Sequence, residues 1–320
     1  MKRVAVLRGG PSTEYDVSLQ SGAEVLKALR DLDYVSKDIV ITRSGEWLES
    51  GIVRSPEKAL DAVDVVFIAL HGQYGEDGQL QRILQRLNIP FTGSNAFASA
   101  IAYNKEMAKQ TLREHGISMA KHRRIVKSEI TDIHAEMEAI IAELGSELFI
   151  KPVAGGSSIG ARYIPHADAL YEALNEMLPE SGTLMVEEFI RGREATVGVL
   201  EKFRNEDLYV LPAIEIVPPN GSPYFSYEVK YNGTTQEICP GRFSYHEKAK
   251  LSDAAAKIHK LLNCDHYSRT DFIIRDGEVF FIETNTLPGL TAESLFPKAA
   301  AAVGLDFKQL IKHLVETSKA

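Results

Sequence analysis

The sequence predicts an α/β protein that begins with a parallel sheet and continues with smaller α+β units. Within the first ninety residues, apolar runs typical of strands alternate with helical patterns, which is the order expected of βαβ units. The strand-like runs are residues 4–7, 39–42 and 65–70, and the helical patterns are residues 21–32 and 79–87. Beyond residue 93, shorter strands and helices are mixed. We therefore place a first α/β domain at residues 1–93.

A second, α+β domain is predicted over residues 94–186. A stretch of small residues leads to Asn104, which is a good N-cap for a helix that ends at Gly116. Further strands are expected at residues 122–126, 147–152 and 161–164, with helices at 134–144 and 167–177. This mixture of short strands and helices is typical of a small α+β unit.

The remaining residues, 187–320, are predicted to form a third domain. Strand patterns occur at residues 184–190, 195–200 and 208–217, before a helix, a hairpin and C-terminal helices. Between them lies a long irregular segment, residues 218–244. A segment of this length without regular structure usually covers a site. We expect it to be mobile in the free protein and to become ordered when ligands bind.

Composition and charge exclude several classes of function. The chain has 320 residues and a formal net charge of −8, so no overall basic field attracts nucleic acid or an anionic membrane. The apolar run near the N-terminus is too short for a signal peptide, and no stretch approaches the ~20 apolar residues of a membrane span. We expect a cytoplasmic protein. Cys239 and Cys264 lack the spacing of a zinc site or a disulfide framework.

The stretch SRTDFIIRDGEVFFIETN, residues 268–285, is predicted to form a hairpin that turns at Asp276-Gly277. A two-residue loop would place Asp271 and Glu283 on opposite faces of the hairpin. We expect instead a three-residue loop, with Gly277 in the left-handed region, because it aligns the polar residues on one face. That face is Arg269, Asp271, Glu283 and Asn285, and the other, mostly core, is Thr270, Phe272, Ile274, Phe280, Ile282 and Thr284.

Two carboxylates and an amide on one face predict a site for a hard cation. Mg²⁺ that is bound through a few protein oxygens and through phosphates fits this set better than zinc does. The alternative is a structural salt bridge between Arg269 and a carboxylate, since ion pairs readily mimic sites. That alternative leaves Asn285 and the irregular TLPGLT after Thr284 unexplained.

Other motifs have both a functional and a structural interpretation. In FIKPVAGGSSIG, a strand ends at Lys151 and a Gly/Ser loop follows, whose N–H groups could hold phosphate, although such turns are common. Glu187 and Glu188 are adjacent, so they point to opposite faces of their strand. Glu14 follows the first strand and a Gly-Gly turn. His71 ends a later parallel strand, where α/β sheets bind ligands.

Together these motifs resemble the D-alanine–D-alanine ligase family of the ATP-grasp fold, in order over nearly the whole chain. The matching stretches are GGPSTEYDVSLQSG, LHGQYGEDGQLQ, IPFTGSNAFASAIAYNK, KPVAGGSSIG, VEEFIRGRE, YEVKY, RTDF and ETNTLPGLTAESLFPKAA. The resemblance implies three α/β domains, with ATP between the second and third and the amino acids between the first and third. It also implies a homodimer that serves the synthesis of peptidoglycan precursors.

The resemblance implies a role in ATP binding for several residues. Lys105 and Lys151 would contact the phosphates, and Glu194 would contact the ribose. The adenine would meet Glu187 and the chain at Glu188, Phe189 and Ile190. Two Mg²⁺ ions, which Mn²⁺ could replace, would be held by Asp271, Glu283 and Asn285.

It also implies the reaction. The carboxylate of one D-alanine would attack the γ-phosphoryl group of ATP, and the amino group of a second D-alanine would attack the resulting acyl phosphate. Arg269 and the N–H of Gly289 would stabilise the oxyanion. Glu14 would bind the first ammonium group in a set with Ser157 and Tyr231, and His71 would lie near. The second substrate would meet Lys230, Ser294 and Leu295.

Two alternatives remain open from the sequence. The acceptor could be D-lactate or D-serine instead of D-alanine, although Tyr231 stands where the D-alanine enzymes of the family have tyrosine. The chain could also be an ATP-binding module without turnover. The presence of Arg269 argues against this second alternative, because a protein that only binds nucleotide needs no oxyanion group.

Overall fold

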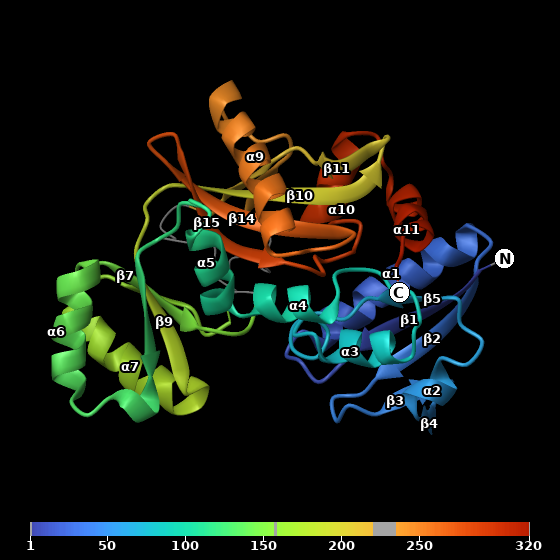
Figure 1. Ribbon diagram of the computed structural model, residues 1–320, viewed down its shortest axis with the longest axis horizontal. Helices are drawn as coiled ribbons and strands as arrows, with labels where there is room; N and C mark the ends of the chain where they lie inside the picture. The colour runs from blue at the N-terminus through green and yellow to red at the C-terminus, as the bar shows by residue number, and fades with distance from the viewer. Residues whose placement is uncertain (1, 157–158, 220–234, 320) are drawn as a thin grey trace.

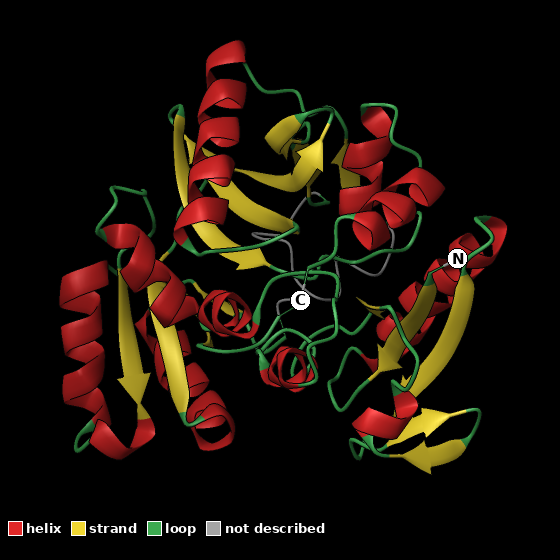
Figure 2. Ribbon diagram, turned by 45° about the vertical axis from the view of Figure 1, so that its right-hand side comes forward, coloured by secondary structure: helices red, strands yellow, loops and turns green. Residues whose placement is uncertain are grey.

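The computed structural model describes residues 2–156, 159–219 and 235–319. The strands form three sheets, each with flanking helices, and Figure 2 shows them as three separate lobes. None of the helices in these residues is long and apolar enough to cross a membrane. The division into domains at residues 93 and 186 stays a proposal, and strand β9 (Thr183–Glu188) runs across the second of these positions.

The first sheet has the order β4-β3-β2-β1-β5. Its strands are β1 (Arg3–Gly9), β2 (Val35–Ile41), β3 (Trp47–Glu49), β4 (Ile52–Arg54) and β5 (Val65–Ile68), and its helices are α1 (Tyr15–Asp31), α2 (Pro56–Ala59) and α3 (Gln79–Arg86). The expected parallel pairing is confirmed for β1 with β2 and with β5. The antiparallel edge of β3 and β4 was not expected, because three-residue strands are too short to show an alternating pattern.

Helix α1 begins six residues earlier than the pattern predicts, at Tyr15 instead of residue 21. Its buried face in the first turns consists of Ser18, Ser21 and Gly22. These small residues hide the apolar periodicity from which a helix is recognised. The early start places Glu14 at the N-cap of α1, at the carboxyl end of β1.

The central part of the chain forms a four-stranded antiparallel sheet of order β6-β9-β7-β8. Besides β9, this part of the chain contains α4 (Ala96–Tyr103), α5 (Lys105–Arg113), β6 (His122–Val126), η1 (Lys127–Glu129), α6 (Ile133–Leu144), β7 (Leu148–Pro152), β8 (Arg162–Ile164) and α7 (Ala167–Ser181). Asn104 caps α5 as predicted, since its side chain accepts the N–H groups of Glu106 and Met107. Helices α6 and α7 pack against each other and against β9.

The third sheet has the order β13-β12-β10-β14-β15, with β11 paired to β10. Its elements are β10 (Arg193–Phe203), β11 (Glu206–Val210), β12 (Ile214–Val217), β13 (Gln236–Ile238), α9 (Tyr245–Leu261), β14 (Tyr267–Arg275), β15 (Glu278–Asn285), α10 (Leu295–Ala302) and α11 (Phe307–Glu316). Helix α9 covers one face of this sheet (Figure 1). Most of the segment expected to be mobile, residues 218–244, lies outside the described residues.

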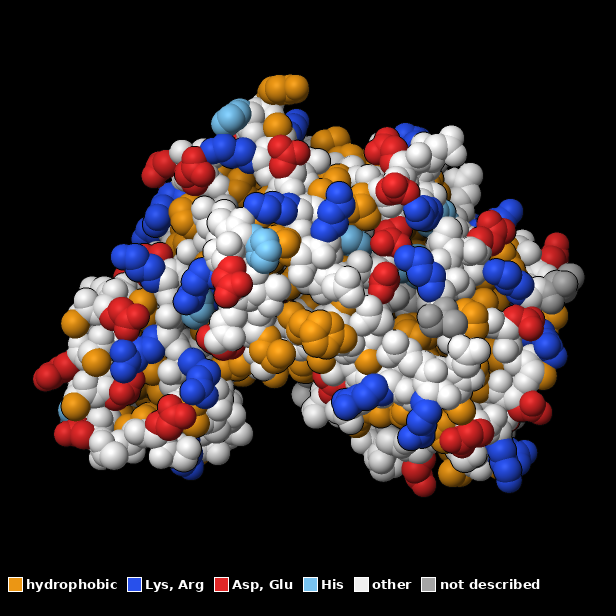
Figure 3. Space-filling view, in the orientation of Figure 1, with side chains coloured by type: hydrophobic (Ala, Val, Ile, Leu, Met, Phe, Trp, Pro, Cys, Tyr) orange, Lys and Arg blue, Asp and Glu red, His pale blue; other side chains and the backbone are white. Residues whose placement is uncertain are grey.

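The C-terminal helices connect the third sheet to the first. Helix α11 packs on α1, and one apolar core joins β1 and β5 to Leu200, Phe296 and Leu314. The central sheet has its own core with α6 and α7. Figure 3 shows a notch between the lobe of the central sheet and the lobe of the first sheet, and basic and acidic side chains are interspersed on this face.

The hairpin of β14 and β15 corrects the predicted loop. Arg275 pairs with Glu278, so the loop has two residues, Asp276 and Gly277, with φ angles of 54° and 76°. Asp271 nevertheless lies opposite Glu283, because a β-bulge lets Phe272 pair with Phe281 and leaves one extra residue before Glu283. The expected alignment of the two carboxylates is therefore correct, but a bulge produces it.

The bulge also changes the core face that we expected. Phe281 is 2% exposed and belongs to the core under α9, whereas Phe280 and Ile282 are half-buried and line a pocket. The assignment of Phe280 and Ile282 to the core was wrong. Phe272 and Ile274 are buried as predicted.

Candidate active site

Two adjoining pockets lie where the three sheets meet. The first lies between the central sheet and the hairpin of β14 and β15, and the second lies between that hairpin, the first sheet and α10. Lys105, Glu194 and Glu283 belong to both pockets. Every site residue predicted from the sequence, within the described part of the chain, lines one pocket or the other. Ser157, Lys230 and Tyr231 lie outside the described residues.

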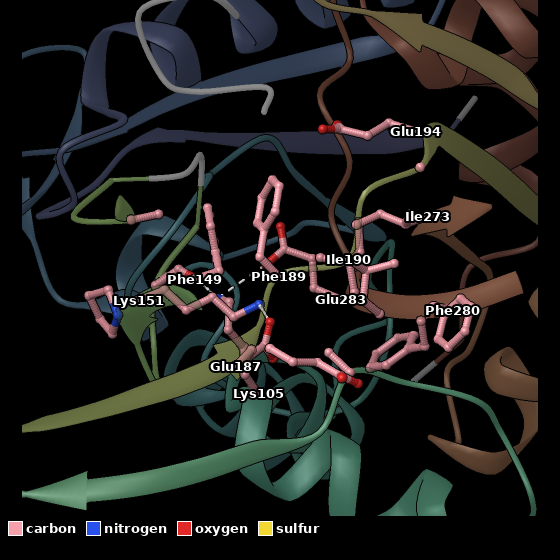
Figure 4. A pocket seen from close by; sticks show the side chains of 18 of the residues that line it. Lys105, Phe149, Lys151, Glu187, Phe189, Ile190, Glu194, Ile273, Phe280 and Glu283 are labelled. Carbon is pink, nitrogen blue, oxygen red and sulfur yellow. Dashed lines mark hydrogen bonds and ion pairs between the residues drawn. The ribbon is translucent and has the colours of Figure 1, made fainter. Parts of the chain in front are cut away.

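The first pocket has apolar walls and a charged end (Figure 4). Phe149, Phe189 and Ile190 come from β7 and from the segment after β9, and Figure 4 shows them close together. Ile273 and Phe280 come from the hairpin on the other side. A flat aromatic ring fits between such walls, and the lysines at the charged end suit an anionic group.

Lys105 connects the charged end of the first pocket to the second pocket. Its Nζ lies 3.2 Å from Glu283 Oε2 and donates to the carbonyl oxygen of Gly155 at 2.5 Å. Lys105 is the first residue of α5, directly after its cap, so the position of the side chain is set by the helix terminus. Burial opposes ionisation of Glu283, but the positive charges of Lys105 and Lys151 lower the pKa of its carboxyl group.

A second set of ion pairs surrounds Glu187. Lys151 Nζ lies 2.9 Å from Glu187 Oε2, and Lys109 Nζ donates to the other oxygen, Oε1. Burial alone would raise the pKa of Glu187, but Lys109 and Lys151 lower it to about 2. The neighbouring Glu188 points away, and its carboxylate accepts the N–H of Lys121 at 2.9 Å. Sequence reasoning missed Lys109, although it stands four residues after Lys105 on the same helix.

In the second pocket, Arg269 and Asp271 form a two-point ion pair. Arg269 is 9% exposed, and its Nε and Nη2 donate to Asp271 at 3.1 and 3.2 Å. Thr196 also donates to Asp271. Arg269 and Asp271 thus form the salt bridge that was the alternative to a metal site. Glu283 takes no part in this salt bridge, because its own partner is Lys105. Asn285 Oδ1 accepts the N–H of Leu287 at 2.8 Å, which orients the amide at the end of β15.

The donor set of Asp271, Glu283 and Asn285 fits Mg²⁺. All three residues line the second pocket, and Asp271 and Glu283 are cross-strand partners. Within the described residues, no group of three or more His, Cys, Asp or Glu side chains could hold a metal by itself. A magnesium ion here would therefore complete its shell with phosphate and water oxygens, as this ion commonly does beside phosphates.

The first sheet contributes Glu14, His71 and Glu76 to the second pocket. His71 is 5% exposed, and its ring nitrogens lie 2.9 Å from Ser21 Oγ and 3.2 Å from the carbonyl oxygen of Leu287. These contacts link the first sheet to the turn after β15. Glu76, which sequence reasoning did not name, accepts the N–H of Gly72 at 3.0 Å.

Glu76 should make the free energy of unfolding depend on pH. Burial, and next the negative charge of Glu14, raise the pKa of Glu76 to about 8. Between the ordinary glutamate pKa and 8, the native protein keeps a proton that the unfolded chain has lost, so the free energy of unfolding falls as pH rises. Glu76→Gln should remove this loss, which is at most about 1.4 kcal/mol per pH unit. Urea unfolding at several pH values measures the free energy of unfolding of both proteins. Parallel dependences on pH for the wild type and Glu76→Gln would contradict the prediction.

Gly289, Ser294 and Leu295 complete the second pocket at the start of α10. Ser294 is the N-cap residue, and its Oγ accepts the N–H of Thr291 at 3.1 Å. A Cβ atom at Gly289 would lie 3.0 Å from Ser294 Oγ, so the backbone at Gly289 runs close to this side chain. The helix terminus favours an anion at this end of the pocket.

Two family models match the chain. The model described as "D-ala D-ala ligase N-terminus" matches residues 3–59 and 50–94, and "D-ala D-ala ligase C-terminus" matches residues 111–316. The relatives include the D-alanine–D-alanine ligase of Syntrophobacter fumaroxidans, which is 38% identical over 98% of this chain and 96% of its own. That of Leptospira interrogans is 36% identical, over 99% of this chain and 98% of its own.

Solved structures of similar proteins have the same fold. The D-alanine–D-alanine ligase of Bacillus anthracis in complex with ATP has a TM-score of 0.80 and 28% identity, and the match covers 99% of this chain and 97% of that one. The VanG D-Ala:D-Ser ligase of Enterococcus faecalis has a TM-score of 0.84 and 32% identity, over 98% of both chains. Each match covers nearly the whole chain and therefore includes the segments that line both pockets.

Proposed function

Because the chain belongs to the D-alanine–D-alanine ligase family, we propose that it joins two D-alanine molecules in an ATP-dependent reaction that supplies peptidoglycan precursors. ATP phosphorylates the carboxylate of one D-alanine, and the amino group of the second displaces the phosphate, which gives the dipeptide, ADP and phosphate. The observation that carries the assignment to this site is the meeting of the two pockets at Lys105 and Glu283.

ATP would occupy the first pocket. Its adenine would lie between Phe189 and the hairpin, with its amino group at Glu187 and with the backbone from Glu188 to Ile190 at its edge. Glu194 would bind the ribose. Lys105 and Lys151 would bind the phosphates, since both lie at the charged end of this pocket and their present partners are carboxylates that an anion could replace.

The metal ions would be held by Asp271, Glu283 and Asn285. Mg²⁺ bound there would neutralise the phosphate charge as the γ-phosphoryl group is transferred, and Mn²⁺ has the same preference for oxygen ligands. The contribution of the protein is to hold two carboxylates opposite each other across the strand pair. Release of Glu283 from Lys105 would make its oxygens accessible.

The amino acids would occupy the second pocket. Glu14 would bind the ammonium group of the first D-alanine, near His71. Arg269 and the N–H of Gly289 would hold the oxyanion that forms when the second amino group attacks. The carboxylate of the second D-alanine would lie at Ser294 and Leu295, where the N-terminus of α10 favours an anion. Ser157, Lys230 and Tyr231 belong to this proposal through the family resemblance alone.

The proposal is tested by phosphate release in the presence of ATP, Mg²⁺ and one amino or hydroxy acid at a time. D-alanine alone should support turnover, and D-serine or D-lactate added at low D-alanine should be incorporated less well. Preferential incorporation of D-serine would favour the activity named for the VanG enzyme, and nucleotide binding without turnover on any acceptor would favour a binding module. The product is identified by mass spectrometry.

We further propose that the protein acts in the cytoplasm as a homodimer and binds neither nucleic acid nor membrane. The family resemblance supports the homodimer, and the net charge of −8 supports the absence of nucleic acid. Light scattering coupled to gel filtration measures the assembly directly. A mass equal to one chain at micromolar concentration would exclude the dimer.

A further inference from the structure

Lys109 is a buried lysine that the reaction described above does not use. It lies on α5, four residues after Lys105, and its side chain is 0% exposed. Its ammonium group donates to Glu187 Oε1, and it does not line either pocket. A lysine is rarely buried so fully unless it has a charged partner. Glu187 is that partner.

The two lysines at Glu187 differ in their access to ligand. Lys151 lines the first pocket and bonds Glu187 Oε2, so a nucleotide can reach it. Lys109 lies behind Glu187, where no ligand in the pocket can reach it. If phosphate draws Lys151 away, the carboxylate of Glu187 keeps only Lys109 as a counter-ion. Without Lys109, Glu187 would then be a buried and unpaired carboxylate, which is strongly unfavourable.

The charge of Glu187 matters for the base that the pocket accepts. An ionised carboxylate only accepts hydrogen bonds, so it favours a base with an exocyclic amino group, such as adenine. It repels a base with a carbonyl at the same position, such as hypoxanthine. A protonated glutamate could donate to that carbonyl and would lose this discrimination. Recognition of adenine therefore requires that Glu187 stay ionised and keep its orientation.

We propose that Lys109 is the positioning residue for base recognition: it holds Glu187 ionised and oriented toward the base while Lys151 binds phosphate. This inference rests on the proposed binding of ATP in the first pocket. The other charged or titratable groups around Lys109 are Glu106 on its own helix and His122 on β6, the strand partner of Glu187. Glu106 and His122 lie beside each other, with His122 Nε2 3.7 Å from Glu106 Oε2.

The test compares ATP with ITP, which has a carbonyl in place of the amino group. The wild type should prefer ATP by about 10²-fold or more in kcat/KM, because a site that is built to bind an N–H group rejects an analogue without it. In Lys109→Met, this preference should fall by about tenfold, through a higher KM for ATP and an unchanged or lower KM for ITP. Lys250→Met, which removes an exposed ion pair to Glu278, is the matched control and should keep the wild-type preference.

A second pair of variants separates base recognition from folding. Glu187→Gln should lower the preference for ATP, and Lys109→Met added to Glu187→Gln should change it by less than about twofold, because Lys109 acts only through the charge of Glu187. The double variant should also fold even if Lys109→Met alone does not, since it buries no unpaired carboxylate.

Three outcomes overturn the inference. They are an unchanged preference for ATP in folded Lys109→Met, a fivefold or larger further change in the double variant, and a double variant that does not fold. Failure of the proposed function looks different. A wild type that does not discriminate between ATP and ITP would show that Glu187 does not contact the base. That result would contradict the proposed binding of ATP in the first pocket without any comparison of variants.

Discussion

Glu283→Gln is expected to lower kcat by about 10³-fold or more while the protein still folds, since a metal ion held by this carboxylate would neutralise the phosphate charge and help to position the γ-phosphoryl group. Glu283 lies opposite Asp271 across the hairpin and faces the junction of the two pockets. The substitution keeps the shape of the side chain and removes the charge. The apparent half-saturation concentration of Mg²⁺ should rise as well, and a titration of phosphate release against Mg²⁺ measures it.

Asp271→Asn should have an equally large effect on kcat but a different effect on stability. Arg269 is 9% exposed and bonds Asp271 with two nitrogens, so the substitution leaves a buried guanidinium without its carboxylate. Loss of one partner of a buried pair destabilises by about 3 kcal/mol. A large loss of stability in Asp271→Asn alone is therefore compatible with a metal ligand, and Glu283→Gln is the cleaner test of the metal site.

Glu278→Gln is the matched control for the metal ligands. Glu278 lies on the same strand, its side chain is 61% exposed, and it pairs with Lys250 at the surface. This variant should keep the wild-type kcat and the wild-type dependence on Mg²⁺. Full activity with unchanged Mg²⁺ dependence in Glu283→Gln would exclude the metal assignment and leave the carboxylate as a structural partner of Lys105.

The hairpin shows how far the sequence predicts the fold. The strands, the turn at Asp276-Gly277 and the pairing of Asp271 with Glu283 could be predicted, because alternation and turn chemistry are local. The two-residue loop and the bulge could not, since they give the same alignment of carboxylates as a three-residue loop and a bulge has no sequence signature of its own. Besides the loop length, the error affected the core, where Phe281 takes the place that was predicted for Phe280.

The site shows a similar limit. Motifs that follow strands singled out Glu14, His71 and Lys151 near strand ends, and the family resemblance added Lys105. Both routes missed Lys109, because its partner, Glu187, is 78 residues away in the sequence, on strand β9. Glu76 was missed because its raised pKa results from burial near Glu14. The burial of a single polar residue in a turn cannot be predicted from alternation. Charge pairing between distant elements is thus the part that only the structure supplies.

Arg269→Lys is expected to lower kcat by about 10²- to 10³-fold with little change in the affinity for ATP, because loss of an oxyanion donor acts mainly on the chemical step. Arg269 lines the second pocket and not the first. Lysine keeps the positive charge but cannot bond Asp271 with two parallel N–H groups, nor offer a further N–H to an oxyanion in the same plane. Calorimetric titration with ATP and steady-state kinetics with D-alanine separate the two effects.

The control for this exchange is Arg242→Lys. Arg242 is 61% exposed and bonds Glu215 through Nε at 2.8 Å, so it offers an arginine–carboxylate pair outside the pockets. This variant should match the wild type in kcat. Arg269→Lys must also keep a cooperative urea transition, because Asp271 retains a cation beside it. Wild-type kcat in folded Arg269→Lys would reduce Arg269 to a structural counter-ion of Asp271. A parallel loss of ATP affinity would place its effect on nucleotide binding instead of on the tetrahedral oxyanion.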